Sequence, residues 1–136
     1  MATTSTIGTS SRNYSTIASW LAAFTTGGWI GECYNDSEFL VTSTVHFTGH
    51  ATSASDYITL RTATGQGFKD HASVQTNALK YNVSNGVGIR CATAYTNTVN
   101  VSEDYVTLQN IQIKNDNTGG GASALGNNVT GATNSW

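Results

Sequence analysis

Acidic side chains next to an aromatic ring are the first candidates for chemistry in this sequence. Glu32, Asp36 and Glu38 form an acidic cluster, and Tyr34 lies within it. Glycoside hydrolysis needs two carboxylates several ångströms apart, and an aromatic ring is a typical contact for a sugar. A solvated turn explains the same residues and is the favoured interpretation, with a carbohydrate contact as the alternative.

The other titratable residues do not form the pattern of an active site. Asp56 and Asp104 each precede an alternating strand, so we expect them to cap turns. The histidines lack metal-ligand spacing, and His46 is expected to point outward because apolar residues flank it. The sequence therefore predicts no catalytic residue, no metal ligand and no cofactor, and enzyme activity is not favoured. The further residues weighed for these roles are Asp70, Glu103, His50 and His71.

Cysteine usage is sparse and has no motif. Cys33 and Cys91 lie far apart in the chain without a C-x-x-C pattern. Two small buried residues are the favoured interpretation, and a disulfide stays open as the alternative.

Composition excludes several classes of partner. Only 10% of the residues are charged and the net charge is -2, so no basic field is available for nucleic acid or for an anionic membrane. The sequence has no apolar run of membrane-spanning length and no secretory signal at its start. Hydrophobic residues make up 38%, and a background of Thr, Ser, Asn and Gly suits flat β surfaces with tight turns.

One amphipathic helix is predicted from Ser15 to Phe24, with Ser15 as its N-cap. Ile17, Trp20, Leu21 and Phe24 follow helical spacing and form one apolar stripe. This stripe must cover a core, so we expect the helix to close one end of the fold.

Short strands with alternating apolar and polar residues are predicted after the helix, separated by Gly, Asn, Asp and Ser clusters. Each strand is expected to bury one face. The predicted strands are Trp29–Tyr34, Phe39–Phe47, Tyr57–Thr62, Ala78–Tyr81, Val87–Cys91, Thr98–Val101 and Tyr105–Lys114.

An internal repeat indicates the architecture. Residues 56–60 (DYITL) recur at 104–108 as DYVTL, an offset of 48 positions. Two coils of roughly 24 residues each would give this offset in a β-solenoid. Matched residues should then lie on one parallel sheet, two strand spacings or roughly 10 Å apart. The residues expected in the core are Ile58, Leu60, Val106 and Leu108, and those expected outside are Tyr57 and Tyr105.

The predicted fold class is all-β, a right-handed parallel β-helix with an N-terminal amphipathic capping helix. Residues 1–28 would form the N-terminal segment and cap, and residues 29–136 the coils, incomplete at the C-terminus. The final coil, residues 124–130, has no obvious cover in the sequence, so we expect partners at that end.

Several segments carry a resemblance to a known family. They are Ile7-Gly8, Tyr14–Ile17 with Trp20, Trp29–Phe39 and Gly86–Ile89. In these segments the chain resembles the right-handed β-helix repeat proteins encoded by tailed bacteriophages and related metagenomic sequences. The resemblance covers most of the chain up to about Lys114 and is more specific for the start of such a helix than for any activity.

The resemblance implies a virion location and a structural role, as a capsid decoration, head fibre or tail appendage. Expected partners are copies of the chain itself, with a trimer as one option, phage capsid or tail proteins, and a host glycan. The alternatives are the N-terminal part of a polysaccharide-degrading tailspike or lyase, and a carbohydrate-binding module. The residues predicted to bind are Tyr34, Asp36, Glu38, Tyr57 and Tyr105.

Overall fold

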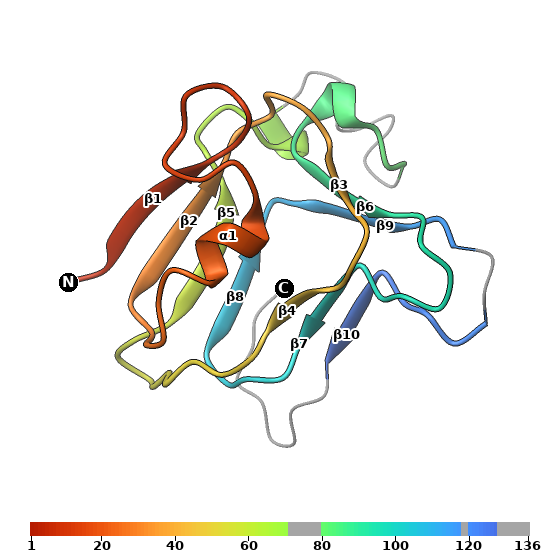
Figure 1. The fold of residues 1–136 in the computed structure, drawn as a ribbon. Helices are drawn as coiled ribbons and strands as arrows, with labels where there is room; N and C mark the ends of the chain where they lie inside the picture. Colours follow the sequence, from red (N-terminus) through yellow and green to blue (C-terminus); the bar gives the residue numbers. More distant parts are fainter. Residues whose placement is uncertain (71–79, 118–119, 128–136) are drawn as a thin grey trace.

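The computed structural model describes residues 1–70, 80–117 and 120–127. Short strands dominate this part of the protein (Figure 1). None of the helices in these ranges is long and apolar enough to cross a membrane. In chain order the elements are β1 (Thr3–Ile7), α1 (Ile17–Leu21), β2 (Trp29–Cys33), β3 (Phe39–Val41), β4 (Val45–Phe47), β5 (Ile58–Thr62), the 3-10 helices η1 (Phe68–Asp70) and η2 (Val83–Asn85), β6 (Gly88–Cys91), β7 (Val99–Val101), β8 (Val106–Gln109), β9 (Gln112–Asn115) and β10 (Leu125–Asn127).

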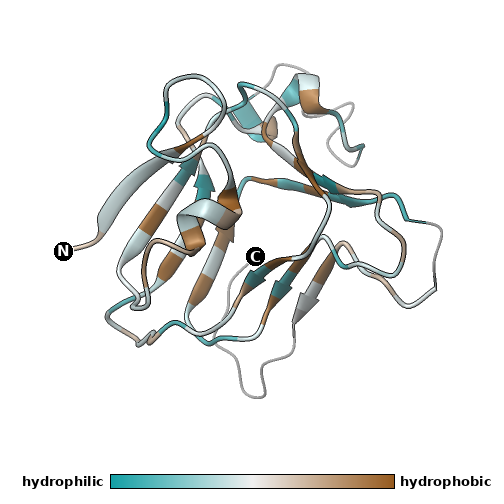
Figure 2. Ribbon diagram, viewed as in Figure 1, coloured by the Kyte–Doolittle hydropathy of each residue, from teal (hydrophilic) through white to brown (hydrophobic). Residues whose placement is uncertain are grey.

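The strands form three separate parallel sheets. The first sheet has the order β1-β2-β5-β8, the second β3-β6-β9 and the third β4-β7-β10. From β2 onward the chain visits the first, second and third sheets in turn. Figure 1 shows the sheets around a shared interior, and Figure 2 shows hydrophobic residues recurring along their strands.

Inward side chains of successive strands are aligned in columns by the register of the sheets. In the first sheet Ile58 pairs with Val106 and Leu60 with Leu108, and all four are buried. These apolar columns make one core between the sheets. The corresponding columns of the second and third sheets are Phe39, Ile89 and Ile113, and Val45, Val99 and Leu125.

The predicted fold class is wrong, because the sheets are separate and do not form one continuous, regularly coiled solenoid. Paired strands are unevenly spaced along the chain. Ile89 and Ile113 are 24 positions apart, whereas Val45 and Val99 are 54 apart. A long connection with two 3-10 helices separates β5 from β6, so the coil of constant length that the sequence suggested does not exist.

The repeated motif was placed on the correct sheet but at the wrong spacing. Residues 58–61 of β5 pair directly with residues 106–109 of β8 in parallel, and the predicted core residues face inward. The two strands are neighbours, so one strand spacing separates them and not two. The sequence predicts two coils within the offset of 48 positions. In the structure the chain leaves the first sheet at β5, passes once through the second and third sheets, and returns at β8.

Helix α1 closes one end of the core, although it is shorter than the predicted helix. It begins after Thr16, whose side chain accepts a bond from the Ser19 backbone N–H in a capping box. Ser15 is therefore not the N-cap. The predicted apolar stripe is buried, and the indole of Trp20 packs so closely on β2 that a Cβ at Gly31 would lie 2.9 Å from it.

Sharp turns divide two of the predicted strands. Residues 39–47 form β3 and β4 on different sheets, and residues 105–114 contain most of β8 and β9. Asn110 makes the second turn with a φ of 57°, a left-handed conformation that asparagine tolerates better than most residues. Strand β1 was not predicted at all. Of the predicted strand Ala78–Tyr81, residues 78 and 79 lie outside the described residues and the rest is not strand.

Candidate functional site

The predicted acidic cluster does not converge on one site, because each of its carboxylates pairs with a different arginine. The arginines come from distant parts of the chain, and the ion pairs join separate elements of the fold. The charged groups therefore connect strands and loops across the surface. The pairs are Glu32 with Arg61 at 2.7 Å, Asp36 with Arg12 at 2.9 Å and Glu38 with Arg90 at 2.8 Å.

Arg12 ties the loop after β1 to the turn after β2. Its guanidinium donates to both carboxylate oxygens of Asp36, and it also lies 3.6 Å from the centroid of the Tyr34 ring. The hydrogen bonds from Arg12 hold the pKa of Asp36 below its ordinary value of 3.8. A sugar approaching Tyr34 would meet a ring face that is already covered by Arg12.

Glu38 belongs to a larger polar network on the outer face of the second sheet. It accepts from Arg90 through both oxygens, at 2.8 Å each, and from the Tyr81 hydroxyl at 2.9 Å. The bonds from Arg90 are the main cause that lowers the pKa of Glu38, and burial is the main cause that raises the pKa of Tyr81. Arg90 and Lys114 both form ion pairs with Asp116. Ion pairs and hydrogen bonds thus link five charged or phenolic side chains into one network.

The repeated tyrosines point outward, as predicted, but they do not form a flat platform. Tyr57 and Tyr105 lie 5.3 Å apart between ring centroids, at an interplanar angle of 77°. Tyr57 is exposed and Tyr105 half-buried. This edge-to-face contact stabilises neighbouring strand ends. Asp56 accepts from Ser53 and Ser55 within its own turn, which confirms its predicted capping role.

His50 and Glu103 form a buried pair that the sequence did not suggest. Their side chains are 6% and 8% exposed, and Nδ1 of His50 lies 3.0 Å from Glu103 Oε2. The other ring nitrogen, Nε2, lies 3.2 Å from the carbonyl oxygen of Leu21 at the end of α1. Both neighbouring groups, a carboxylate and a backbone carbonyl, are hydrogen-bond acceptors. The pair therefore fastens the cap helix to the loop before β8.

The other histidines and the cysteines are not assembled into a site. His46 is exposed on β4, as predicted, and lies 2.8 Å from the Ser102 hydroxyl. His71 lies outside the described residues. Cys33 and Cys91 are buried and free, and burial raises the pKa of Cys33. Within the described ranges no three His, Cys, Asp or Glu residues are grouped to hold a metal ion.

A polar cleft of about 280 Å³ lies on the outer side of the first sheet. Glu32 and Arg61 form one part of its wall, and η1 forms another. The Glu32–Arg61 pair uses only one carboxylate oxygen of Glu32. The cleft thus presents carboxylate, guanidinium, ammonium, amide and hydroxyl groups together, and none of the predicted binding residues lines it. Its polar side chains are those of Glu32, Arg61, Thr62, Thr64, Lys69, Asp70, Gln109 and Asn110.

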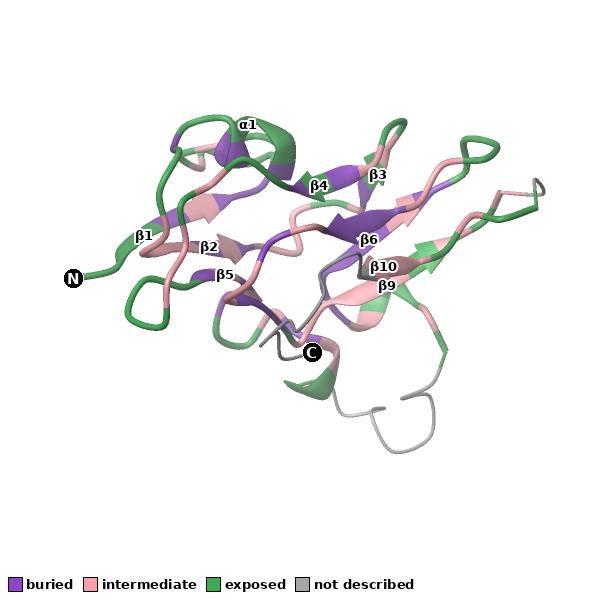
Figure 3. Ribbon diagram, turned by 90° about the horizontal axis from the view of Figure 1, so that it is seen from below, coloured by how far each residue is buried: buried purple, intermediate pink, exposed green. Residues whose placement is uncertain are grey.

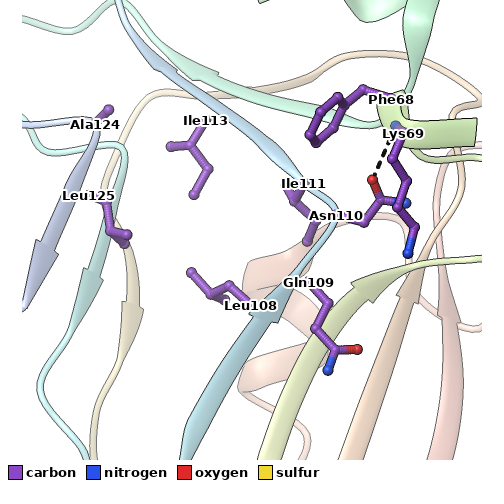
Figure 4. Close-up of a pocket in the computed structure, with 9 residues that line it drawn as sticks. All are labelled: Phe68, Lys69, Leu108, Gln109, Asn110, Ile111, Ile113, Ala124 and Leu125. Carbon is purple, nitrogen blue, oxygen red and sulfur yellow. Dashed lines mark hydrogen bonds between the residues drawn. The ribbon is translucent and has the colours of Figure 1, made fainter. Parts of the chain in front are cut away.

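A larger hollow of about 820 Å³ lies where the last strands of the three sheets meet. Figure 4 shows its apolar side chains, which come from η1, β8, β9, the turn between β8 and β9, and the start of β10 with the residue before it. The inward columns of the core end here, and Figure 3 shows that β9 is mostly of intermediate burial. The residues around it are Phe68, Lys69, Leu108, Gln109, Asn110, Ile111, Ile113, Ala124 and Leu125.

Comparisons with known proteins add no relative. No family model matches the chain, no curated protein matches it and no solved structure matches it. The resemblance in the sequence therefore stays a hypothesis.

Sequence reasoning missed the arginine partners because they depend on the register of strands. Glu32 and Arg61 are paired positions of β2 and β5, and each is the fourth residue of its strand. That matching position was a usable signal. The contact between His50 and Glu103, 53 positions apart, had no comparable signal.

Proposed function

We propose that this protein is a structural module of a tailed-phage virion that acts by assembly and binding, as a capsid decoration, head fibre or tail appendage. The resemblance of its N-terminal segments to phage β-helix repeat proteins suggests the location. The observation that carries the structural role is the contrast, within the described residues, between a core covered by α1 and the hollow bordered by β8, β9 and β10. Partly buried apolar side chains at the end of a core, here Ile111, Ile113 and Leu125, are typical of a surface that contacts other protein.

The use of charge supports the same role. Each carboxylate of the predicted acidic cluster forms an ion pair with an arginine, and these ion pairs hold strands and loops together. A glycosidase needs two carboxylates poised on one substrate, one of them to deliver a proton. Carboxylates whose pKa is lowered by ion pairs, as in Asp36 and Glu38, are poor proton donors near neutral pH.

The test is quantitative mass spectrometry of purified phage particles whose genome encodes this chain. We expect the protein to remain with the particles through a density gradient, in a copy number comparable to that of other structural proteins. Its absence from the particles, or presence only in the lysate, would contradict the proposal. Purified protein should release no reducing sugar and no unsaturated uronate from surface polysaccharide of the host.

Carbohydrate binding is a second candidate, favoured by the polar cleft on the first sheet. Amide, hydroxyl and carboxylate groups converge there, as they do in sites that orient polar ligands. Gln109 is the residue to change, since it is exposed on β8 and its truncation leaves the core intact.

A glycan array followed by titration calorimetry tests this candidate. Gln109→Ala should weaken any glycan binding at least several-fold, whereas Thr6→Ala, at the matching outward position of β1, should leave it unchanged. Equal binding by both variants would place the glycan elsewhere, and no binding by the parent protein would remove the candidate.

A further inference from the structure

We propose that the turn between β6 and β7 is a binding site for neutral polysaccharide, in which the ring of Tyr95 packs on one face of a sugar residue. This site is separate from the polar cleft, because the cleft lies on the first sheet and the turn connects the second sheet to the third. Binding at the turn goes beyond the proposed structural role and does not depend on it.

Tyr95 has a backbone conformation that tyrosine does not favour. Its φ is 58°, in the left-handed region, where the Cβ of a bulky residue crowds the backbone and glycine or asparagine fits more easily. Tyr105 has a similar φ of 56°, but its ring packs edge-to-face on Tyr57. Tyr95 is 79% exposed, so packing within the chain does not compensate for its conformation. Backbone strain at an exposed aromatic residue points to a role in contacts with a ligand.

Hydrogen bonds from the end of β9 and from the segment after it hold this turn in place. Asn115 and Asn117 donate through Nδ2 to the carbonyl oxygen of Thr96, at 2.8 and 3.2 Å. Asn97 Oδ1 accepts from the backbone N–H of Ser123 at 2.7 Å. Figure 1 shows the turn next to the segment that follows β9. The ring is therefore carried by a braced backbone, which lowers the entropy lost when a ligand binds.

The residues on both sides of Tyr95 are small and uncharged. Residues 92–94, two alanines and a threonine, are exposed, and Thr96 and Asn97 add a hydroxyl and an amide. The ring is therefore accessible, and hydrogen-bonding groups lie next to it in the chain. A sugar needs this combination, because its C–H face packs on an aromatic ring while its hydroxyls bind polar side chains.

Charge beside the turn is neutralised within the chain, which favours a neutral ligand. Asp116 lies next to the turn, since its backbone N–H donates to the carbonyl oxygen of Cys91. Its carboxylate pairs with Lys114 at 2.8 Å and with Arg90 at 3.2 Å. Residues 92–97 themselves carry no charge.

The apolar surface at this turn suits a sugar better than a protein partner. A stable protein interface takes about 800 Å² from each partner, with several anchors at its centre. One tyrosine offers on the order of 200 Å². The other large apolar side chains exposed within the described residues are Met1, Leu40 and Tyr57, and none of them belongs to this turn. One aromatic ring matches the face of one sugar ring.

Affinity electrophoresis tests the site, because a native gel that contains a polysaccharide slows a protein that binds it even weakly. Dextran, galactomannan and β-glucan are the neutral probes, and alginate and polygalacturonate the acidic ones. We expect at least one neutral polymer to retard the native chain. Tyr95→Asn should lose this retardation, and Tyr95→Phe, which keeps the ring, should retain it. Leu40→Ala is the matched control, since Leu40 is 57% exposed on β3 and its truncation should change nothing.

Thermal melting of the same variants separates binding from packing. Asparagine adopts the left-handed region more easily than tyrosine, so Tyr95→Asn should melt at the temperature of the parent or above it. Loss of retardation together with a lower melting temperature would mean that Tyr95 supports the fold, and would overturn the proposal.

The gels also distinguish this site from the polar cleft. Gln109→Ala should be retarded like the parent, whereas retardation lost in Gln109→Ala and kept in Tyr95→Asn would place the ligand in the cleft and overturn the proposal. Retardation by the acidic polymers alone would contradict a neutral ligand. No retardation of the parent by any polymer would also overturn the proposal and would leave a protein as the partner of this turn. None of these results bears on whether the protein belongs to the virion, which the particle measurement decides.

Discussion

The two ends of the core differ in how they are finished. At one end α1 lies over the strands, and its residue Trp20 is 0% exposed. At the other end, in the part of the chain that the structure describes, the same inward columns reach β8, β9 and β10 and border a hollow. The alternation that buries Val99 completely leaves Leu125 half-buried one strand later. Strand pattern alone therefore does not close a core of stacked parallel strands, and a separate element must cover each end.

The largest effect should come from removing the anchor of the covered end. Trp20→Ala deletes a fully buried indole and should lower the free energy of unfolding by about 3–5 kcal/mol. Urea denaturation followed by circular dichroism measures it. Ala23→Ser, at an exposed position just after α1, is the control and should change little. A Trp20→Ala protein as stable as its parent would mean that α1 does not cover the core.

A pair of leucines in one column compares the interior with the open end. Leu60→Ala should cost about 2–5 kcal/mol, because a fully buried side chain leaves a cavity among packed neighbours. Leu108→Ala should cost at or below the lower end of that range, because Leu108 already borders the hollow. Equal losses, measured in the same denaturation experiment, would show that the hollow is filled.

The fastening of the cap is the third comparison. His50→Ala leaves the buried carboxylate of Glu103 without its imidazole partner and frees Leu21 O at the end of α1, so we expect a loss of about 2–3 kcal/mol. Amides of α1 should exchange faster with solvent. His46→Ala removes an exposed ring and should cost less than about 0.5 kcal/mol. If both variants lose the same stability, the pair does not hold the cap.

Local pattern predicted the covered end well and the path between the sheets poorly. Helical spacing gave the buried stripe of α1, and period-two alternation gave the inward residues of β5 and β8, because both patterns record which side of an element is buried. The 48-position repeat recorded that two strands share a sheet but not how many strands lie between them. That number depends on the long connection between β5 and β6, whose length no periodicity constrains.

The candidate site was harder to predict, for a related reason. Glu38 and Tyr81 are adjacent only because a segment distant in sequence lies beside the start of β3. The sequence shows three acids within seven residues but not the strands that bring an arginine to each. The three acids that are close in the sequence therefore form three separate ion pairs with arginines, which we call braces.

The smallest effect expected is the loss of those braces in acid. Asp36 and Glu38 have pKa values below the ordinary 3.8 and 4.5 because arginines bind their charged forms. The unfolded chain takes up these protons at the ordinary values, so the contribution of the braces is complete above about pH 4.5 and is lost as the pH falls through the lower folded values. The side chains of Asp36 and Glu38 are 12% and 22% exposed, so solvent still screens both ion pairs and the decline should be shallow. Thermal melts from pH 6 downward should therefore show a smaller acid decline in Glu38→Gln than in the parent, while Ser37→Ala should follow the parent. Identical curves for Glu38→Gln and the parent would mean that the brace at β3 contributes nothing to stability.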